Sequence, residues 1–328
     1  MSLNYSDRVY GKIEITEPVI LELINCPTMQ RLKGIDQYGY SDPRTAIKSN
    51  PSRFEHSLGV YLLLKRYGAP LEEQIAGLIH DVSHAAFSHC IDYVLAAGSE
   101  KKQSHQDNIF DNFVRQSEIP QILKKYNFNL DYILNDNNFP LKEKELPDLC
   151  ADRLDYSLRD AITLGLIENG GYFLAQLEID NNRWIFKSFS SAAEYAKLFL
   201  NLNTNYYCDF AVAVMYRTVG DCLRYALTQG YITETDLYTT DQEVLKKVYH
   251  YVPVDLKLKL LFEKMNSQTG FKNDPDDYDA KVFCKSRMVD PLCRHNGEIK
   301  RISEIETKWK EIIKREAKPK EYFLKFEK

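Results

Sequence analysis

The stretch His80-Asp81-Val82-Ser83-His84-Ala85-Ala86-Phe87-Ser88-His89 decides the fold of this chain, because it places polar side chains at the end of an apolar helix. The segment from Leu71 to His80 predicts that helix, with Ile75, Leu78 and Ile79 on its inner side. Adjacent side chains of a helix point about 100° apart, so an imidazole and a carboxylate can share an ion that lies between their directions. The pair His80-Asp81 therefore indicates a metal site.

Two further residues complete the expected set of ligands. Five of the 7 histidines fall between positions 56 and 105, and this density favours a metal site over an isolated buried histidine. His56 opens the preceding helix, directly after Arg53-Phe54-Glu55. Asp152, in a helix expected from about residue 146 to 164, is the best candidate for a carboxylate that balances the charge. The predicted ligands of one divalent ion are His56, His80, Asp81 and Asp152.

The mixture of imidazole and carboxylate ligands suits a divalent transition metal better than Ca or Mg. The ligand types do not distinguish among Mn, Fe, Co, Ni and Zn. Four protein ligands leave positions on a six-coordinate ion for water and a substrate oxygen. Such an ion lowers the pKa of its water and offsets charge that develops on a phosphoryl group. Hydrolysis of a phosphoester by metal-activated water is therefore the expected chemistry.

The composition restricts the class of protein and its partners. The 328 residues are 44% hydrophobic and 27% charged, as is ordinary for a globular protein, and the net charge of −4 argues against nucleic acid as a partner. The 22 tyrosines suit half-buried helix faces as well as nucleoside pockets. Scattered cysteines without a Cys-x-x-Cys pair indicate a reducing compartment. Because the sequence shows no signal peptide and no run of 18 apolar residues, we expect a cytoplasmic protein without membrane contact.

Apolar periodicity predicts a mainly α fold in two parts. Residues 1–230 form a helical domain, which is interrupted by a small β-hairpin at residues 177–179 and 184–186. Residues 231–328 form a mixed α/β extension of unknown role, with a strand at residues 280–284. The tail from Lys300 to Lys328 is dense in Lys and Glu and predicts a solvated helix.

Four segments carry a resemblance to a known family. They are Arg53-Phe54-Glu55-His56-Ser57-Leu58-Gly59-Val60, the stretch from His80 to His89, Asp152-Arg153-Leu154-Asp155-Tyr156, and Gln30-Arg31-Leu32-Lys33-Gly34-Ile35-Asp36-Gln37. In this order and spacing they resemble the HD-domain metal-dependent phosphohydrolases, and within them the deoxynucleoside triphosphate triphosphohydrolase branch, over roughly residues 7–230. The resemblance implies an HD-type helical core, one bound ion, and a nucleotide or another small phosphorylated substrate. A homo-oligomer is compatible with it.

The resemblance also implies roles for residues at the phosphate end of the substrate. Arg53 and Arg153 would contact phosphate, a role that suits the planar fork of a guanidinium. His84 would lie near the scissile phosphate, as a proton donor to the leaving oxygen or as an electrostatic stabiliser. The remaining members of this catalytic group would be His89 and Asp92, which support the site, and His105, which faces phosphate.

Three residues would bind the rest of the nucleotide. By the same resemblance, Tyr156 would contact the sugar and Gln37 would read the deoxyribose end. Asp160 would contact the substrate or support the site. Asp152, Tyr156 and Asp160 are spaced by four residues, so they share one face of their helix.

The sequence departs from the family pattern after the hairpin. The family holds phosphates and sugar with Arg, His and Tyr at four-residue spacing, where this chain has Phe199, Asn203 and Tyr207. Tyr38 stands where the family has a smaller aliphatic residue. The departures leave the hydrolytic centre intact and the number of phosphates on the substrate open. A nucleoside monophosphatase, a cyclic nucleotide phosphodiesterase and a non-catalytic nucleotide-binding module therefore remain as alternatives.

Overall fold

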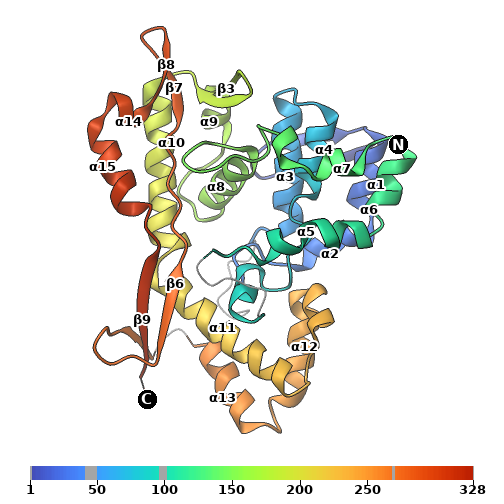
Figure 1. Ribbon diagram of the computed structural model, residues 1–328, viewed down its shortest axis with the longest axis vertical. Helices are drawn as coiled ribbons and strands as arrows, with labels where there is room; N and C mark the ends of the chain where they lie inside the picture. Colours follow the sequence, from blue (N-terminus) through green and yellow to red (C-terminus); the bar gives the residue numbers. More distant parts are fainter. Residues whose placement is uncertain (1, 41–49, 96–101, 268–269, 328) are drawn as a thin grey trace.

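The structure is a computed structural model that describes residues 2–40, 50–95, 102–267 and 270–327 (Figure 1). The chain is mainly helical, as the sequence predicts. Its α-helices are α1 (Pro18–Asn25), α2 (Pro27–Arg31), α3 (Arg53–Arg66), α4 (Leu71–Ile79), α5 (His105–Gln116), α6 (Ile119–Lys125), α7 (Leu130–Leu134), α8 (Ala151–Thr163), α9 (Gly171–Gln176), α10 (Phe189–Leu202), α11 (Phe210–Thr228), α12 (Asp241–Tyr251), α13 (Leu256–Met265), α14 (Ile302–Ile305) and α15 (Thr307–Glu316). Tighter or wider helical turns are η1 (Leu32–Gly34), η2 (Ser88–Tyr93), η3 (Asp136–Asn138), η4 (Asn203–Tyr207) and η5 (Glu234–Tyr238).

Small sheets are attached to this helical body. β1 (Leu3–Asp7) and β2 (Gly11–Ile15) form an antiparallel hairpin. The predicted hairpin is present as β3 (Leu177–Asp180) and β4 (Arg183–Phe186). Strand β4 also pairs in parallel with β7 (Leu292–His295), and β7 pairs in antiparallel with β8 (Glu298–Arg301). A third sheet has the order β5 (Phe271–Asn273), β9 (Lys320–Phe326), β6 (Ala280–Cys284). The fold is thus a helical core with small sheets, most of them built from the C-terminal region.

Helix α3 lies inside the fold and carries His56 in its second turn. Its start is defined by a capping box, in which the Ser52 hydroxyl accepts from the backbone N–H of Glu55 and the Glu55 carboxylate accepts from the backbone N–H of Ser52. Most side chains of α3 from Arg53 to Leu64 are buried, so packing on several sides determines where the helix lies. His56 is therefore held on a rigid element.

Two glycines allow neighbouring helices to approach α3 closely. A Cβ atom at Gly77 of α4 would press on the side chain of Leu64. A Cβ atom at Gly59 of α3 itself would overlap with the side chains of Asp155 and Arg159 of α8. Helices α4 and α8 therefore both pack closely against α3, which lies between them in Figure 1.

The C-terminal region shares apolar cores with the earlier part of the chain. Val289, Cys293 and Trp309 belong to the core cluster that also contains α3 and α8. Val282 and Leu324, from β6 and β9, pack in a second cluster with α11. The division of the chain at residue 230 stays a prediction. Among the described residues, no helix is both long enough and apolar enough to cross a membrane.

Two expected elements differ in the structure. Helix α8 begins at Ala151 rather than near residue 146. Pro147 disfavours helical backbone at the residue before it, and the Asp148 N–H closes a turn onto the Glu145 carbonyl at 3.0 Å. The tail is also not one helix, because α15 ends at Glu316 and residues 320–326 form β9. Pro319 cannot continue a helix, and the buried Leu324 gives this strand an inner face.

Candidate metal centre and substrate cavity

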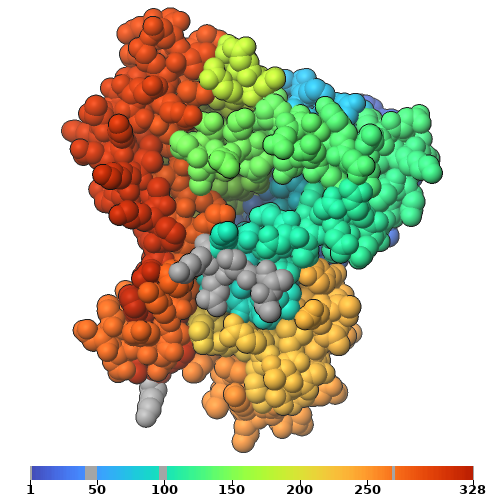
Figure 2. Space-filling model, in the orientation of Figure 1, coloured from blue at the N-terminus to red at the C-terminus, as the bar shows by residue number. Residues whose placement is uncertain are grey.

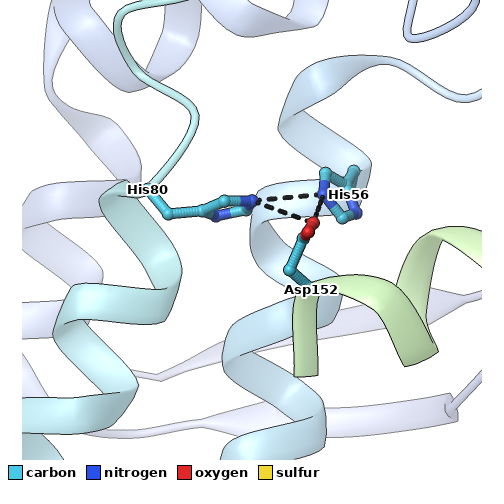
Figure 3. Close-up of side chains that lie close together, drawn as sticks. All are labelled: His56, His80 and Asp152. Atoms are coloured by element: carbon cyan, nitrogen blue, oxygen red, sulfur yellow. Dashed lines mark hydrogen bonds and ion pairs between the residues drawn. The ribbon is translucent and has the colours of Figure 1, made fainter. Parts of the chain in front are cut away.

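The predicted ligands meet where α3, α4 and α8 converge. His56 comes from α3, Asp152 from the first turn of α8, and His80 and Asp81 follow the last turn of α4. His56 Nε2 lies 2.9 Å from Asp152 Oδ1 and 3.2 Å from His80 Nε2. Asp81 lies 3.4 Å from His80 Nε2 and 3.8 Å from His56 Nε2. Figure 3 shows His56, His80 and Asp152 pointing toward one another.

The second ring nitrogens of the two histidines fit a metal-ligand role. His56 Nδ1 lies 2.8 Å from Asp155 Oδ2, and His80 Nδ1 lies 2.8 Å from the Gly77 carbonyl oxygen. Both partners accept hydrogen bonds, so each Nδ1 carries the proton and each Nε2 keeps its lone pair for an ion. With an ion bound, the site would thus offer two neutral imidazoles and two carboxylates, a set that suits one divalent transition metal.

Asp155 orients His56 through a buried network that sequence reasoning did not single out. Arg159, one turn later on α8, donates to both oxygens of Asp155 at 3.0 and 2.9 Å. Tyr10 donates to Asp155 at 2.8 Å, and Arg159 also donates to Asp7 at 3.1 Å. Asp155 and Arg159 are both fully buried, so this pair depends on its full set of partners. The position of Asp155, one helical turn after Asp152, was the sequence signal that could have identified this network.

The charges at the centre influence one another strongly. Burial alone lowers the pKa of His56, but hydrogen bonds to Asp152 and Asp155 raise it to about 10. Burial alone raises the pKa of Asp152, but hydrogen bonds from His56 and His80 hold it well below its usual range. In the absence of an ion, the site therefore favours positive charge beside its carboxylates. A bound cation would supply that charge instead.

Arg53 and His84 lie directly beside Asp81. Arg53 Nη1 donates to Asp81 at 2.8 Å, while its other nitrogens donate to Ser88 Oγ at 3.0 Å and to the Gln37 carbonyl at 3.3 Å. His84 Nε2 lies 3.4 Å from Asp81, and burial together with Arg53 lowers the pKa of His84 to about 3. His84 is thus neutral near pH 7 in this structure.

The centre opens into a cavity of about 660 Å³. Figure 2 shows a hollow on the surface, bordered by α5, by the segment that precedes α8 and by the C-terminal region. The predicted site residues that line this cavity are Gln37, Arg53, His56, His80, Asp81, His84, His89, Asp152, Arg153, Tyr156 and Asp160. Most of the predicted site residues are therefore brought together around one cavity.

Asp92 and His105 lie behind this wall rather than on it. Asp92 Oδ2 is 3.4 Å from His89 Nδ1, and Asp92 Oδ1 accepts from the backbone N–H of His105 at 3.0 Å. The His105 ring points to Tyr238, with Nε2 2.9 Å from the hydroxyl. Asp92 thus connects the start of α5 to His89, whose ring lies 5.2 Å from that of His84.

Aromatic residues form another part of the cavity wall. The Tyr156 ring lies 6.3 Å from the His56 ring and 5.7 Å from the Tyr207 ring. The Tyr207 hydroxyl donates to Asp160 Oδ2 at 2.8 Å. Burial raises the pKa of Asp160 to about 7. Phe199 packs beside these rings in the apolar core, so it supports this part of the cavity wall from behind.

Several cavity residues were not expected from the sequence. Gln103, Gln106, Asp107 and Phe110 come from α5 and the residues before it, and Lys285 and Arg287 follow β6 in the C-terminal region. No local pattern marks these residues, because they reach the cavity only through long-range packing.

Comparison with known proteins agrees with this geometry. A family model described as "HD domain" matches residues 53–159. An uncharacterized protein of Bacillus subtilis, YdhJ, is 36% identical over 88% of this chain and 88% of its own length. The solved structure of a phosphohydrolase from Bacteroides thetaiotaomicron superposes with a TM-score of 0.74 at 18% identity, covering 100% of both chains. The likeness in fold therefore includes the C-terminal region.

Some relatives carry functional names. The metal-dependent phosphohydrolase cns2 of Cordyceps militaris is 38% identical over 50% of this chain and 46% of its own length. The deoxynucleoside triphosphate triphosphohydrolase SAMHD1 of mouse is 28% identical over 51% of this chain and 32% of its own length. The chain thus matches less than half the length of either protein. Together with the ligand geometry, these similarities show that the chain belongs to the HD-domain family of metal-dependent phosphohydrolases.

Proposed function

We propose that this hydrolase acts on a deoxynucleoside triphosphate, with one divalent transition metal held by His56, His80, Asp81 and Asp152. The observation that carries the proposal is the opening of these four residues into a cavity of about 660 Å³, a volume suited to a small ligand. The cavity wall combines cations with tyrosines, which suits a ligand that has both a phosphate chain and a nucleoside. The similarity to SAMHD1, whose name gives this substrate class, supports the same choice.

The residues around the ligands have distinct roles in this proposal. The bound ion would lower the pKa of a water molecule and stabilise negative charge on the reacting phosphate. Arg53 holds Asp81 in place and presents positive charge beside it. His84 is neutral and lines the cavity beside Asp81, so it would lie near the reacting phosphate. Tyr156 lies against His56 and would contact the sugar.

The proposed reaction is hydrolysis at the α-phosphate. The oxygen of water forms a bond to the α-phosphorus, and the bond between that phosphorus and the 5′ oxygen breaks. The 5′ oxygen takes up a proton, and one proton of the attacking water is released. The products are a deoxynucleoside and tripolyphosphate, so no further reactant is needed.

A screen of nucleotides against metals tests the proposal. Nucleoside mono-, di- and triphosphates and cyclic nucleotides would be incubated with the protein and Mn, Fe, Co, Ni or Zn, and the products would be resolved by chromatography. Intact tripolyphosphate from a deoxynucleoside triphosphate is the expected result. Orthophosphate from a monophosphate, or opening of a cyclic nucleotide, would replace the proposed substrate with one of those classes. Tight nucleotide binding without turnover would indicate a regulatory module.

A further inference from the structure

The cationic side chains that line the cavity differ in whether their charge is already paired inside the protein. Besides the histidines, the positive side chains of the cavity are Arg53, Lys142, Arg153, Lys285 and Arg287. A cation whose charge is already paired inside the protein gains less from an incoming phosphate than an unpaired one, because it must give up a partner. The internal partners of each cation therefore indicate which of them are available to a substrate.

The three cations from the N-terminal part of the chain are all engaged. Arg53 pairs with Asp81 at 2.8 Å. The Lys142 ammonium pairs with Asp136. Arg153 Nη1 donates to the Asp148 carbonyl at 2.6 Å and to the Lys144 carbonyl at 3.2 Å. The guanidinium of Arg153 is therefore directed at least partly into the loop before α8, although the sequence predicts it as a phosphate ligand.

Lys285 and Arg287 are different. No carboxylate oxygen of the described residues lies within 4.0 Å of either charged group, and both side chains are only partly buried. Arg287 Nη1 makes a long hydrogen bond of 3.5 Å to the Lys285 carbonyl, which leaves its charge without a carboxylate partner. Lys285 and Arg287 line the same cavity, and burial together with the positive charge of Arg287 lowers the pKa of Lys285. Asp107 faces the same space without forming an ion pair with Lys285. An anion placed between Lys285 and Arg287 would be attracted by both charges.

Asn203 fixes the segment that carries these two cations. Its Oδ1 accepts from the backbone N–H of Arg287 at 2.8 Å, and its Nδ2 donates to the Ser286 hydroxyl at 2.9 Å. Asn203 is fully buried, and it begins the π-helical turn η4, which also carries Tyr207. A π-helical turn is rare and is often found at functional sites. A buried amide thus attaches the cation-bearing segment to the wall of the cavity that holds Tyr207.

We propose that Lys285 and Arg287 form a subsite for the non-reacting phosphates of a nucleotide, positioned by Asn203. The inference rests on the proposed function, since it assigns one part of that substrate. In this inference, two cations of the C-terminal region that lack a carboxylate partner bind the phosphate chain. The ligand quartet and Arg53 act on the phosphate that reacts. A substrate with several phosphates would use both sites, and a substrate with one phosphate would use only the first.

The test compares two substrates with the manganese-loaded protein. Lys285→Gln, Arg287→Gln and Asn203→Ala would be assayed with a deoxynucleoside triphosphate and with bis(p-nitrophenyl) phosphate, which has one phosphate. Each lost charge-assisted contact should raise KM for the triphosphate about tenfold or more, and the double Gln variant should show the larger rise. The kcat values and the activity toward bis(p-nitrophenyl) phosphate should stay close to those of the unmodified protein.

Lys281→Gln is the matched control. Lys281 lies on β6, four residues before Lys285, and its ammonium pairs with Glu321 on the exposed side of the sheet. This variant loses the same charge from the same segment and should leave KM for the triphosphate unchanged. An unchanged KM in the two Gln variants would overturn the inference. So would an equal loss on both substrates, because the residues would then act on the reacting phosphate or on folding.

Calorimetry with inorganic tripolyphosphate separates this inference from the proposed function. If the unmodified protein hydrolyses neither substrate with any metal, the proposed function fails. The manganese-loaded protein should still bind tripolyphosphate, and the double Gln variant should bind it at least about tenfold more weakly. Equal affinity of the two proteins, or no binding by the unmodified protein, would overturn the subsite whatever the outcome of the assays.

Discussion

The ligand quartet and the Lys285–Arg287 pair border the same cavity but are built in opposite ways. The quartet is densely paired, with His56 Nε2 2.9 Å from Asp152 and Arg53 2.8 Å from Asp81. The pair has no carboxylate within 4.0 Å among the described residues and is held by its backbone. The contrast teaches that a site for a permanently bound ion needs neighbouring groups that hold its ligands in place. A site for an anion that binds and leaves instead keeps its cations free of carboxylate partners.

The largest expected effect comes from removing the ion. His80→Ala combined with Asp81→Ala should abolish both bound metal and hydrolysis, because it removes two of four ligands. Metal content measured by mass spectrometry, together with product release, checks this outcome. His250→Ala, on the exposed face of α12, removes a histidine away from the cavity and should change neither. Full activity in the double variant would contradict the assignment of the metal centre.

The next effect concerns the support of the quartet. Asp155→Asn removes the carboxylate from His56 and Arg159, so metal affinity should fall about 10- to 100-fold. The free energy of unfolding should also fall by about 3–5 kcal/mol, because Arg159 is fully buried and loses its main partner. Metal titration and chemical unfolding measure the two changes.

Asp221→Asn provides the matched control for this variant. Asp221 pairs with Arg217 at 2.7 Å with the same four-residue spacing on α11, but both side chains are partly exposed. Its loss should change the free energy of unfolding by about 1 kcal/mol or less and leave metal affinity intact. If the two variants weaken metal binding equally, Asp155 has no special role in holding His56.

The ligand quartet and the Lys285–Arg287 pair also show which parts of the site can be predicted from the sequence. The meeting of His56, His80, Asp81 and Asp152 could be anticipated from the sequence, because each of them lies in a local motif at a helix end or in the first turn of a helix. Their role as metal ligands stays a prediction. The hairpin β3–β4 and the strand β6 followed from alternation of apolar residues. Lys285 and Arg287 carry no comparable signal, since the contact of Asn203 with Arg287 spans two segments that are far apart in the chain.

Two interpretations of the sequence differ from the structure, each for a physical reason. The tail was expected as a solvated helix from its charge, but charged residues on the outer face of β9 have the same composition. Asn203 was considered only as the loss of a phosphate contact. Its amide instead bonds to the segment that carries Lys285 and Arg287, a contact between distant parts of the chain that the sequence did not reveal.

The smallest expected effect comes from Asp160, which lines the same cavity beside Tyr207. Burial raises the pKa of Asp160 to about 7, compared with about 3.9 in an unfolded chain. The folded state therefore binds the extra proton between these values, and the contribution of Asp160 to stability falls as pH rises from 4 to 7. Asp160→Asn keeps an oxygen acceptor for Tyr207 and lacks this titration.

Thermal unfolding at several pH values measures this effect. The Tm of Asp160→Asn relative to the unmodified protein should increase between pH 4 and pH 8, by about 2 °C for each kcal/mol of the burial cost. A difference in Tm that stays constant over this range would contradict the raised pKa. It would also indicate that the aromatic part of the cavity wall is more hydrated than the structure shows.

The most direct test of the account is a crystal structure of the protein with manganese and a non-hydrolysable deoxynucleoside triphosphate, with the ion located by anomalous scattering. The account predicts an anomalous peak among His56, His80, Asp81 and Asp152, with the α-phosphate beside it and the outer phosphates in contact with Lys285 and Arg287. A peak outside the quartet, or a phosphate chain directed away from that pair, would contradict it.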